Sequence, residues 1–269
     1  MLFAKSFVIL HLIRTKNEET MTQNQFTRTQ MMMGKAAMDT LAQSRVAVFG
    51  IGGVGGYVAE VLARSGIGAL DLYDNDRVSI SNINRQIYAL LSTVGRYKVD
   101  VARERIHDIN PLCTVKGFTM FYLPENADEV DLSQYDYVVD CIDTVKAKLE
   151  LVRRCHRLGV PLLSSMGAAN KLDPTAFRVT DISETAIDPL ARIIRKKLRK
   201  EGIFHLKVVC SIEEPLPPVE KPEERQSPQP AAPRRDIPSS NAFVPAAAGL
   251  IAGGEVVKDL INRAGTMRL

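Results

Sequence analysis

Short apolar runs alternate with longer amphipathic stretches along the first two thirds of the chain. The runs predict buried strands at residues 45–49, 69–73, 114–118, 137–142 and 160–164. Apolar residues at helical spacing predict helices between them, at 54–65, 98–109 and 145–158. This alternation is typical of an α/β fold. We expect a Rossmann-like, doubly wound and mostly parallel sheet with right-handed crossovers.

The pattern changes on both sides of this core. A Met-rich helix is predicted at 25–43, ahead of the first strand. A C-terminal extension follows Met166, with an extended segment at 173–179, a basic helix at 189–200, a strand at 206–210 and a closing apolar helix within 241–261. Eight of the 14 prolines lie between Pro215 and Pro238. A flexible, proline-rich insertion is therefore expected at about 213–240.

Two apolar stretches are tested as membrane segments. Residues 7–13 are too short to span a bilayer, and no small-residue cleavage site follows them. Residues 1–20 are therefore read as a leader or as a misassigned start, with Met21 as the alternative first residue, and 21–269 as a single domain. Residues 243–261 are interrupted by Pro245, Glu255 and Lys258, which favours a buried helix. No stable membrane insertion is expected.

Composition excludes several classes of protein. The 269 residues are 45% apolar, which excludes a disordered or fibrous chain. The four cysteines form no CxxC pair, so we expect neither a zinc site nor a disulfide framework, and a cytoplasmic location. The formal charge of +4 is too small for a globally basic protein, so any surface for nucleic acid must be local.

A glycine-rich loop follows the first predicted strand and opens the next helix. Its glycines are Gly50, Gly52, Gly53 and Gly55, in the pattern GxGGxG. Glycines at this place permit a tight turn and bring backbone N–H groups close to a phosphate. Asp74 ends the second strand, where it can accept hydrogen bonds from ribose hydroxyls. The loop predicts a nucleotide site, but NAD, FAD and ATP all remain open, and the loop alone favours a dehydrogenase.

The segment after the second strand shifts the prediction to ATP. Arg85 can bind phosphate oxygens with two parallel hydrogen bonds, and Lys98 adds a mobile charge. A triphosphate in transfer needs such cations, whereas hydride transfer does not. Asp143 follows the fourth strand, at the sheet edge where ligands bind, and can hold Mg²⁺. Each residue alone has a structural alternative, a surface ion pair or a helix cap.

Taken together, these motifs resemble a known superfamily. The chain combines the glycine loop, D-x-D-x-V at 74–78, S-N-x-N-R-Q at 81–86, Lys98 and C-I-D at 141–143. This combination is similar to the ubiquitin-activating-like, or ThiF-type, adenylyltransferases over roughly residues 27–165. The threonylcarbamoyladenosine dehydratase branch is the most similar. Its features recur at residues 26–29, 64–68, 108–111, 172–175, 188–190, 209–213 and 241–245.

The resemblance implies roles for individual residues. It implies contact with ATP through the four loop glycines, Asp74 at the ribose, and Asn84, Arg85, Gln86 and Lys98 at the phosphates, with Mg²⁺ at Asp143. Arg28 resembles an arginine that reaches into the partner subunit's site, which implies a homodimer. The catalytic set is then Arg28, Arg85, Lys98 and Asp143. Cys210 stands where an aromatic residue is expected, so it is not assigned to catalysis.

The resemblance also implies a reaction. This is the ATP-dependent dehydration, with cyclisation, of N6-threonylcarbamoyladenosine next to the tRNA anticodon, through an acyl adenylate. The implied partners are tRNA, but not DNA, and a protein of a sulfurtransferase pathway. The first alternative is an adenylyltransferase for a ubiquitin-like sulfur carrier, whose relatives commonly carry two CxxC zinc pairs. An NAD-dependent dehydrogenase and a non-catalytic nucleotide-binding scaffold are the other two.

The basic helix predicted at 189–200 is the candidate surface for tRNA. It carries six cations within nine positions: Arg192, Arg195, Lys196, Lys197, Arg199 and Lys200. Residues 192, 196 and 199 share one helix face, and so do 197 and 200. The alternative is a solvated helix without a partner. The polyanionic substrate implied by the resemblance favours contact with the phosphate backbone.

Overall fold

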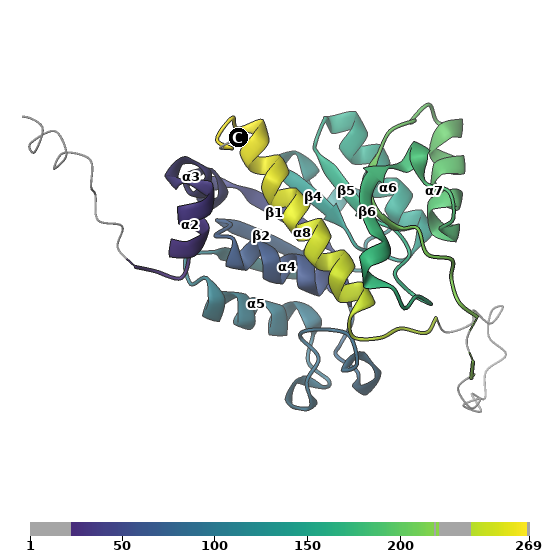
Figure 1. Cartoon of the computed structure of the whole chain (residues 1–269), viewed down its shortest axis with the longest axis horizontal. Coiled ribbons are helices and arrows are strands. Elements are labelled where there is room, and N and C mark those ends of the chain that lie inside the picture. The colour runs from purple at the N-terminus through teal and green to yellow at the C-terminus, as the bar shows by residue number, and fades with distance from the viewer. Residues whose placement is uncertain (1–22, 218, 221–237, 268–269) are drawn as a thin grey trace, which may run out of the picture.

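The fold is a seven-stranded sheet covered by helices on both faces (Figure 1). The computed structural model describes residues 23–217, 219–220 and 238–267. The leader predicted at 1–20 and most of the proline-rich insertion lie outside these residues. Within them, no helix combines the length and the apolar character needed to cross a bilayer.

The strand order confirms the predicted doubly wound fold. The order is β3-β2-β1-β4-β5-β7-β6, and every neighbouring pair is parallel except β7 and β6. The chain therefore winds in one direction from β1 to β3 and in the other from β4 onward. The strands are β1 (Arg45–Phe49), β2 (Ala69–Tyr73), β3 (Thr114–Phe118), β4 (Tyr137–Asp140), β5 (Leu162–Ser165), β6 (Phe177–Asp181) and β7 (Lys207–Ser211).

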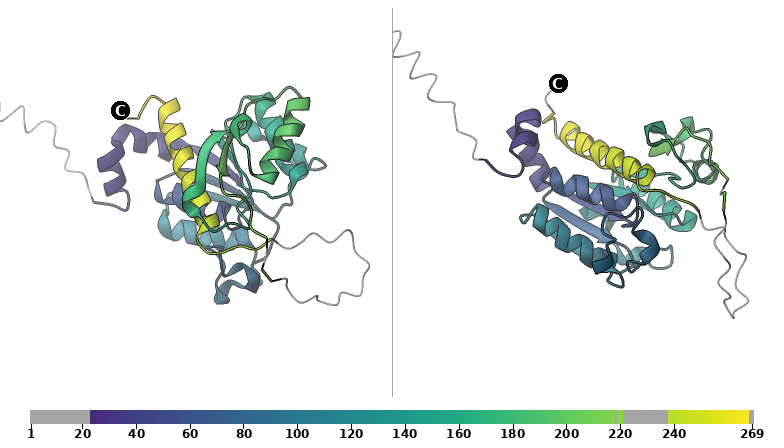
Figure 2. Two further views of the ribbon diagram at one scale, coloured as in Figure 1. Left: turned by 45° about the vertical axis from the view of Figure 1, so that its right-hand side comes forward. Right: turned by 60° about the horizontal axis from the view of Figure 1, so that its bottom comes forward.

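Seven helices surround the sheet in the described residues. Helices α3, α4, α5 and α8 share one apolar core with β1 and β2, while α6 packs on the other face and α7 packs on α6. The left view of Figure 2 shows the yellow helix α8 and the green helix α7 over different parts of the sheet. The helices are α2 (Thr27–Met33), α3 (Lys35–Gln43), α4 (Gly55–Arg64), α5 (Lys98–Ile109), α6 (Val145–Leu158), α7 (Pro189–Lys200) and α8 (Val244–Arg263).

Alternation of side chains along β1 divides the core. Val46 and Val48 point into the layer of α4 and α8, and Ala47 and Phe49 into the layer of α6. All four are fully buried, because a parallel sheet is covered on both faces. This explains why the strand is a continuous apolar run in the sequence.

Most predicted elements are confirmed, and the helices at 98–109, 145–158 and 189–200 match to the residue. The single helix predicted at 25–43 is wrong. Gly34 has φ +87°, outside the helical region, and divides it into α2 and α3. The strand predicted at 137–142 ends at Asp140, because the Asp140 carboxylate accepts the Ile142 N–H and turns the chain.

Helix α8 lies close to α4 because two of its glycines face that helix. A Cβ at Gly249 would lie 2.4 Å from the Val54 carbonyl oxygen, and one at Gly253 would lie 2.7 Å from Val61 Cβ. The next residue, Gly254, has no atom within 4 Å of its Cβ position. These two glycine positions of the C-terminal helix thus permit its close approach to α4.

Adjacent glycines of α8 give a matched test of this packing. Gly253→Ala and Gly254→Ala both gain about 1 kcal/mol of helix propensity. Only the methyl group at 253 overlaps Val61, at a cost of about 1–3 kcal/mol. Urea denaturation is expected to find Gly253→Ala less stable than Gly254→Ala by that amount. Equal stabilities would contradict the close contact between α4 and α8.

Candidate functional site

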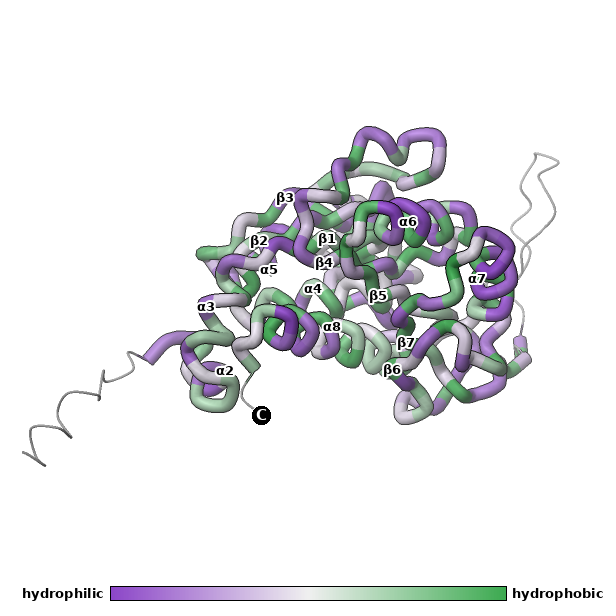
Figure 3. Tube along the Cα trace, turned by 90° about the horizontal axis from the view of Figure 1, so that it is seen from above, coloured by the Kyte–Doolittle hydropathy of each residue, from purple (hydrophilic) through white to green (hydrophobic). Residues whose placement is uncertain are grey.

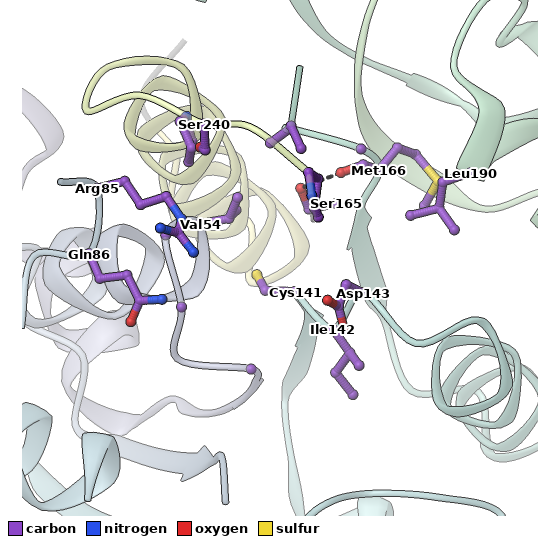
Figure 4. Close-up of a pocket in the computed structure, with 18 of the residues that line it drawn as sticks. Val54, Arg85, Gln86, Cys141, Ile142, Asp143, Ser165, Met166, Leu190 and Ser240 are labelled. Carbon is purple, nitrogen blue, oxygen red and sulfur yellow. Dashed lines mark hydrogen bonds between the residues drawn. The ribbon is translucent and has the colours of Figure 1, made fainter. Parts of the chain in front are cut away.

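A cleft opens at the carboxyl edge of the sheet. Its volume is about 560 Å³, and it is lined by residues that follow β1, β2, β4 and β5 and that begin α7. Figure 4 shows Arg85 and Gln86 on one side of the pocket and Met166 and Leu190 on the other, with Cys141 and Asp143 between them. The cleft therefore lies where parallel α/β sheets bind ligands.

The glycine loop forms one end of the cleft. Gly50 has φ +86°, and a Cβ there would lie 2.9 Å from the Cys141 carbonyl oxygen. A Cβ at Gly55 would lie 1.8 Å from the Gly50 carbonyl oxygen, so Gly55 serves the close turn and does not line the cleft. Gly52 and Gly53 do line it. No side chain caps the N-terminus of α4, which leaves that helix end able to receive an anion.

Asp74 fixes this loop to the next strand. One carboxylate oxygen accepts the Ile51 N–H at 2.7 Å, and the other accepts the Asp76 N–H at 2.8 Å. Burial raises the pKa of Asp74 above its ordinary value, while the charge of Lys98 acts in the opposite direction. Lys98 Nζ lies 2.7 Å from Asp76 Oδ2 and 3.9 Å from Asp74 Oδ2. The carboxylates thus hold the lysine at the cleft.

The S-N-x-N-R-Q segment approaches the loop from the side. Arg85 Nη1 donates to the Ser81 carbonyl and to Asn84 Oδ1, both at 2.9 Å, which orients the guanidinium. Arg85 and the buried Gln86 line the cleft. Asn84 does not line it, and its Nδ2 donates to the Ser240 carbonyl at 3.1 Å. Asn82, which the sequence did not single out, lines the cleft instead.

Asp143 presents an exposed carboxylate to the middle of the cleft. Its position depends on a buried network that sequence reasoning missed. Lys148 Nζ is fully buried and donates to Asp140 Oδ2 at 2.7 Å, to Ser164 Oγ and to the Ser165 carbonyl. A lysine among charged helix residues gives no sign in the sequence that it points inward.

A second ion pair forms the far wall of the cleft. Lys171 Nζ lies 3.7 Å from Asp188 Oδ2, and each side chain is 1% exposed. Gly167 permits this arrangement, since a Cβ there would lie 2.7 Å from Asp188 Oδ2. In the sequence, the motif Asp188-Pro189-Leu190 stands out only as a likeness to the dehydratase branch. Its place in the cleft was not predicted.

The remaining predicted residues lie outside this cleft. Arg28 is exposed on α2, and α3 leads from there to the amino end of β1, on the opposite edge of the sheet. Arg195 donates to the carbonyl and hydroxyl oxygens of Thr185, so its guanidinium is bound within the chain. The other five cations of α7 are exposed, and the helix forms a hydrophilic stretch in Figure 3.

The described residues hold neither a cluster of metal-ligating side chains nor a cysteine with a lowered pKa. No group of three or more His, Cys, Asp or Glu side chains among them is arranged to hold a metal ion. Burial raises the pKa of Cys210 to about 12, so its thiol is protonated at neutral pH. Asp143 is left as a single carboxylate beside a cleft that is large enough for a nucleotide.

Comparison with known proteins identifies the family of this chain. The sequence model of the ThiF family matches residues 26–266. The tRNA threonylcarbamoyladenosine dehydratase of Bacillus subtilis (strain 168) is 49% identical over 242 residues, which cover 89% of this chain and 95% of that protein. The molybdopterin-synthase adenylyltransferase of Escherichia coli (strain K12) is 37% identical over 141 residues, which cover 50% of this chain and 53% of that protein.

A solved structure is similar over nearly the whole fold. The crystal structure of E. coli tRNA N6-threonylcarbamoyladenosine dehydratase in complex with ATP superposes with a TM-score of 0.79 and 34% sequence identity. The match covers 90% of this chain and 95% of that chain. The likeness thus extends beyond the nucleotide half, through the far wall of the cleft and the closing helix.

Proposed function

The chain belongs to the ThiF family, and on that premise we propose that it uses ATP to dehydrate and cyclise N6-threonylcarbamoyladenosine next to the tRNA anticodon. One observation carries this proposal. The likeness to a tRNA threonylcarbamoyladenosine dehydratase runs through almost the whole length of both proteins. The likeness to an adenylyltransferase that serves molybdopterin synthase covers only half of each. The sulfur-carrier alternative is accordingly less well supported.

ATP is the proposed co-substrate, and the cleft provides groups suited to it. Gly52, Gly53 and the uncapped start of α4 form an anion-binding end. Arg85 and Lys98 add two cations there, and Asp74 lies at the end of β2, where a ribose would be held. A dehydratase of similar fold was solved with ATP, which supports this assignment.

Magnesium fits the lone carboxylate in the middle of the cleft. Mg²⁺ keeps several waters and is commonly bound by one or two carboxylates together with substrate phosphates. Asp143 is exposed, and within the described part of the chain only Thr144 donates to it, with an Oγ1–Oδ1 distance of 3.4 Å. In the proposed site Asp143 holds the ion, which would neutralise charge on the phosphates during transfer.

The proposed reaction has two steps. The threonyl carboxylate attacks the α-phosphorus of ATP, pyrophosphate leaves, and an acyl adenylate forms. A ureido atom of the same side chain then attacks the acyl carbon, which closes the ring and expels AMP. The chain's part in the first step is electrostatic, because Arg85 and Lys98 face the charge that develops on the phosphates. The second step is intramolecular, so proximity replaces a covalent enzyme intermediate.

The first test removes one cation from the cleft. Arg85→Ala is expected to lower the rate of pyrophosphate release about 100-fold or more, as for the loss of one transition-state donor. Arg103→Ala is the matched control, because Arg103 is an exposed arginine of α5 outside the cleft. Steady-state pyrophosphate assays with the modified tRNA measure both. A rate for Arg85→Ala close to that of the control would contradict the site assignment.

A homodimer is part of the proposal, with Arg28 completing the partner's site. The support is indirect: Arg28 is an exposed cation that does not reach the cleft of its own chain. Arg28→Ala and Lys98→Ala, each inactive alone, are expected to regain activity when mixed, because a heterodimer carries one intact composite site. Activity is measured after subunit exchange has been verified by mass. Exchange without recovery would place Arg28 outside catalysis.

The exposed cations of α7 are the proposed contact for tRNA phosphates. Charge reversal to Glu at Arg192, Lys196 and Arg199 is expected to weaken tRNA binding and leave ATP binding unchanged. The slope of log affinity against log salt should flatten by about one unit for each phosphate that is no longer bound. The control variant has the same change of net charge, with Glu at Lys35, Arg103 and Lys116, which lie outside α7. If the two triple variants bind tRNA equally well, α7 is only a solvated helix.

Two further elements complete the proposal. A protein partner from a sulfurtransferase pathway stays a prediction from the resemblance. A cytoplasmic location follows from the proposed tRNA substrate.

A further inference from the structure

The ion pair in the cleft wall, Lys171 and Asp188, includes a carboxylate oxygen whose hydrogen-bonding capacity the described residues leave unused. Asp188 Oδ1 accepts the Ala191 N–H at 2.8 Å and thereby caps α7. Asp188 Oδ2 is buried and has no hydrogen-bond partner among the described residues. Lys171 Nζ lies 3.7 Å from that oxygen, which is an ion pair but is longer than a hydrogen bond. A buried carboxylate oxygen without a partner is costly and calls for an explanation.

The fold holds this pair in place from both sides. Gly167 lets the chain pass close to Asp188 Oδ2, where a Cβ would lie at 2.7 Å. Asn241 Nδ2 donates to the Lys171 carbonyl at 2.8 Å. Asn170, with φ +58°, accepts the Leu216 N–H through its carbonyl and donates its own N–H to the Ser239 carbonyl. Lys171 therefore lies on a loop that is held in place by hydrogen bonds to neighbouring segments.

The pair lies at the end of the cleft away from the phosphate-binding cations. Figure 4 shows Leu190, two residues after Asp188, across the pocket from Arg85, with Asp143 between them. Lys171 and Asp188 both line the cleft. A substrate whose carboxylate reacts with the α-phosphorus of ATP near Asp143 would therefore extend its other groups toward Lys171 and Asp188.

The chemistry of ring closure requires a proton acceptor at that end. The reaction removes one oxygen from the carboxyl group, which leaves with AMP, and one hydrogen from a ureido nitrogen. This holds whether the ureido nitrogen or the ureido oxygen attacks, because both routes release one N–H proton. Arg85 and Lys98 are donors and cannot accept it. Asp143 is assigned to the metal ion.

We propose that Asp188 Oδ2 accepts a hydrogen bond from the ureido N–H and takes its proton as the ring closes, while Lys171 donates to the ureido carbonyl. This inference rests on the proposed function. A bond forms from the ureido group to the acyl carbon, the acyl carbon–oxygen bond to AMP breaks, and its electron pair leaves with AMP. The proton moves to Asp188, which becomes neutral. The substrate supplies the hydrogen-bond partner that Asp188 Oδ2 lacks among the described residues.

The test separates the two steps of the reaction. Asn is isosteric with Asp and is an equally good helix cap, so Asp188→Asn keeps the start of α7 while it removes the proton acceptor and the charge that pairs with Lys171. Asp173→Asn is the matched control, because Asp173 caps a neighbouring turn through Thr175 and does not line the cleft. Substrate-dependent exchange between ATP and pyrophosphate reports the first step. Single-turnover formation of the cyclic product on tRNA reports the second.

We expect Asp188→Asn to slow cyclisation about 100-fold or more, the usual effect of removing a general base, while exchange stays within a few-fold of wild type. The control should change neither. Lys171→Met is expected to raise the KM for the modified tRNA, because it removes a donor to the substrate. If Asp188→Asn does not fold, Asp188→Ser also provides a helix cap without a base.

Two outcomes would overturn the inference. Cyclisation by folded Asp188→Asn at the wild-type rate would show that Asp188 takes no proton. Equal losses of exchange and cyclisation would make Asp188 a structural or binding residue. Failure of the proposed function looks different, because the wild-type protein itself would then yield no cyclic product from the modified tRNA and ATP.

Discussion

A single buried ammonium group joins the strand ends from which the cleft is built. Lys148 Nζ is fully removed from water and binds Asp140 Oδ2, Ser164 Oγ and the Ser165 carbonyl, with the longest of these contacts at 3.1 Å. Burial of an unpaired charge would cost several kcal/mol, so the fold must deliver all three acceptors together. They come from the ends of β4 and β5. The loops that leave those ends carry Asp143 and Lys171, which line the cleft.

The nucleotide end of the cleft also depends on polar contacts that join separate segments of the chain. At Gly50 and Gly55 the backbone lies so close to other backbone atoms that no side chain would fit. The carboxylate of Asp74, directly after β2, accepts the Ile51 N–H of the loop at 2.7 Å. The Asp74 side chain is only 9% exposed, and this burial raises the pKa of its carboxyl group. The glycines and the acid that the sequence pattern assigns to the ligand therefore also shape the loop. Gly50 and Asp74 thus both line the cleft and hold the loop in shape, whereas Gly55 serves the turn alone.

The sequence predicts local structure well and spatial neighbours poorly. The bounds of α5 and α7 follow from signals within a few residues, such as Asn110-Pro111 after α5 and Asp188-Pro189 at the start of α7. The antiparallel placement of β6 depends on contacts across the sheet and has no local signal. The same is true of the Lys171–Asp188 pair, and of the choice between Asn82 and Asn84 at the cleft, which depends on how one loop turns.

The two ends of the cleft carry different groups, and α7 connects one of them to the surface. At the nucleotide end, Arg85 and Lys98 supply cations for a triphosphate beside the carboxylates of Asp74 and Asp76. At the other end, Lys171 and Asp188 balance each other, as suits a neutral ureido group. Asp188 caps α7, which buries Ala191, Ile194 and Leu198 and turns five of its six cations outward. Twelve residues span about 18 Å. One rigid helix thus fixes the distance between the proposed phosphate contacts and the wall where the modified base would react.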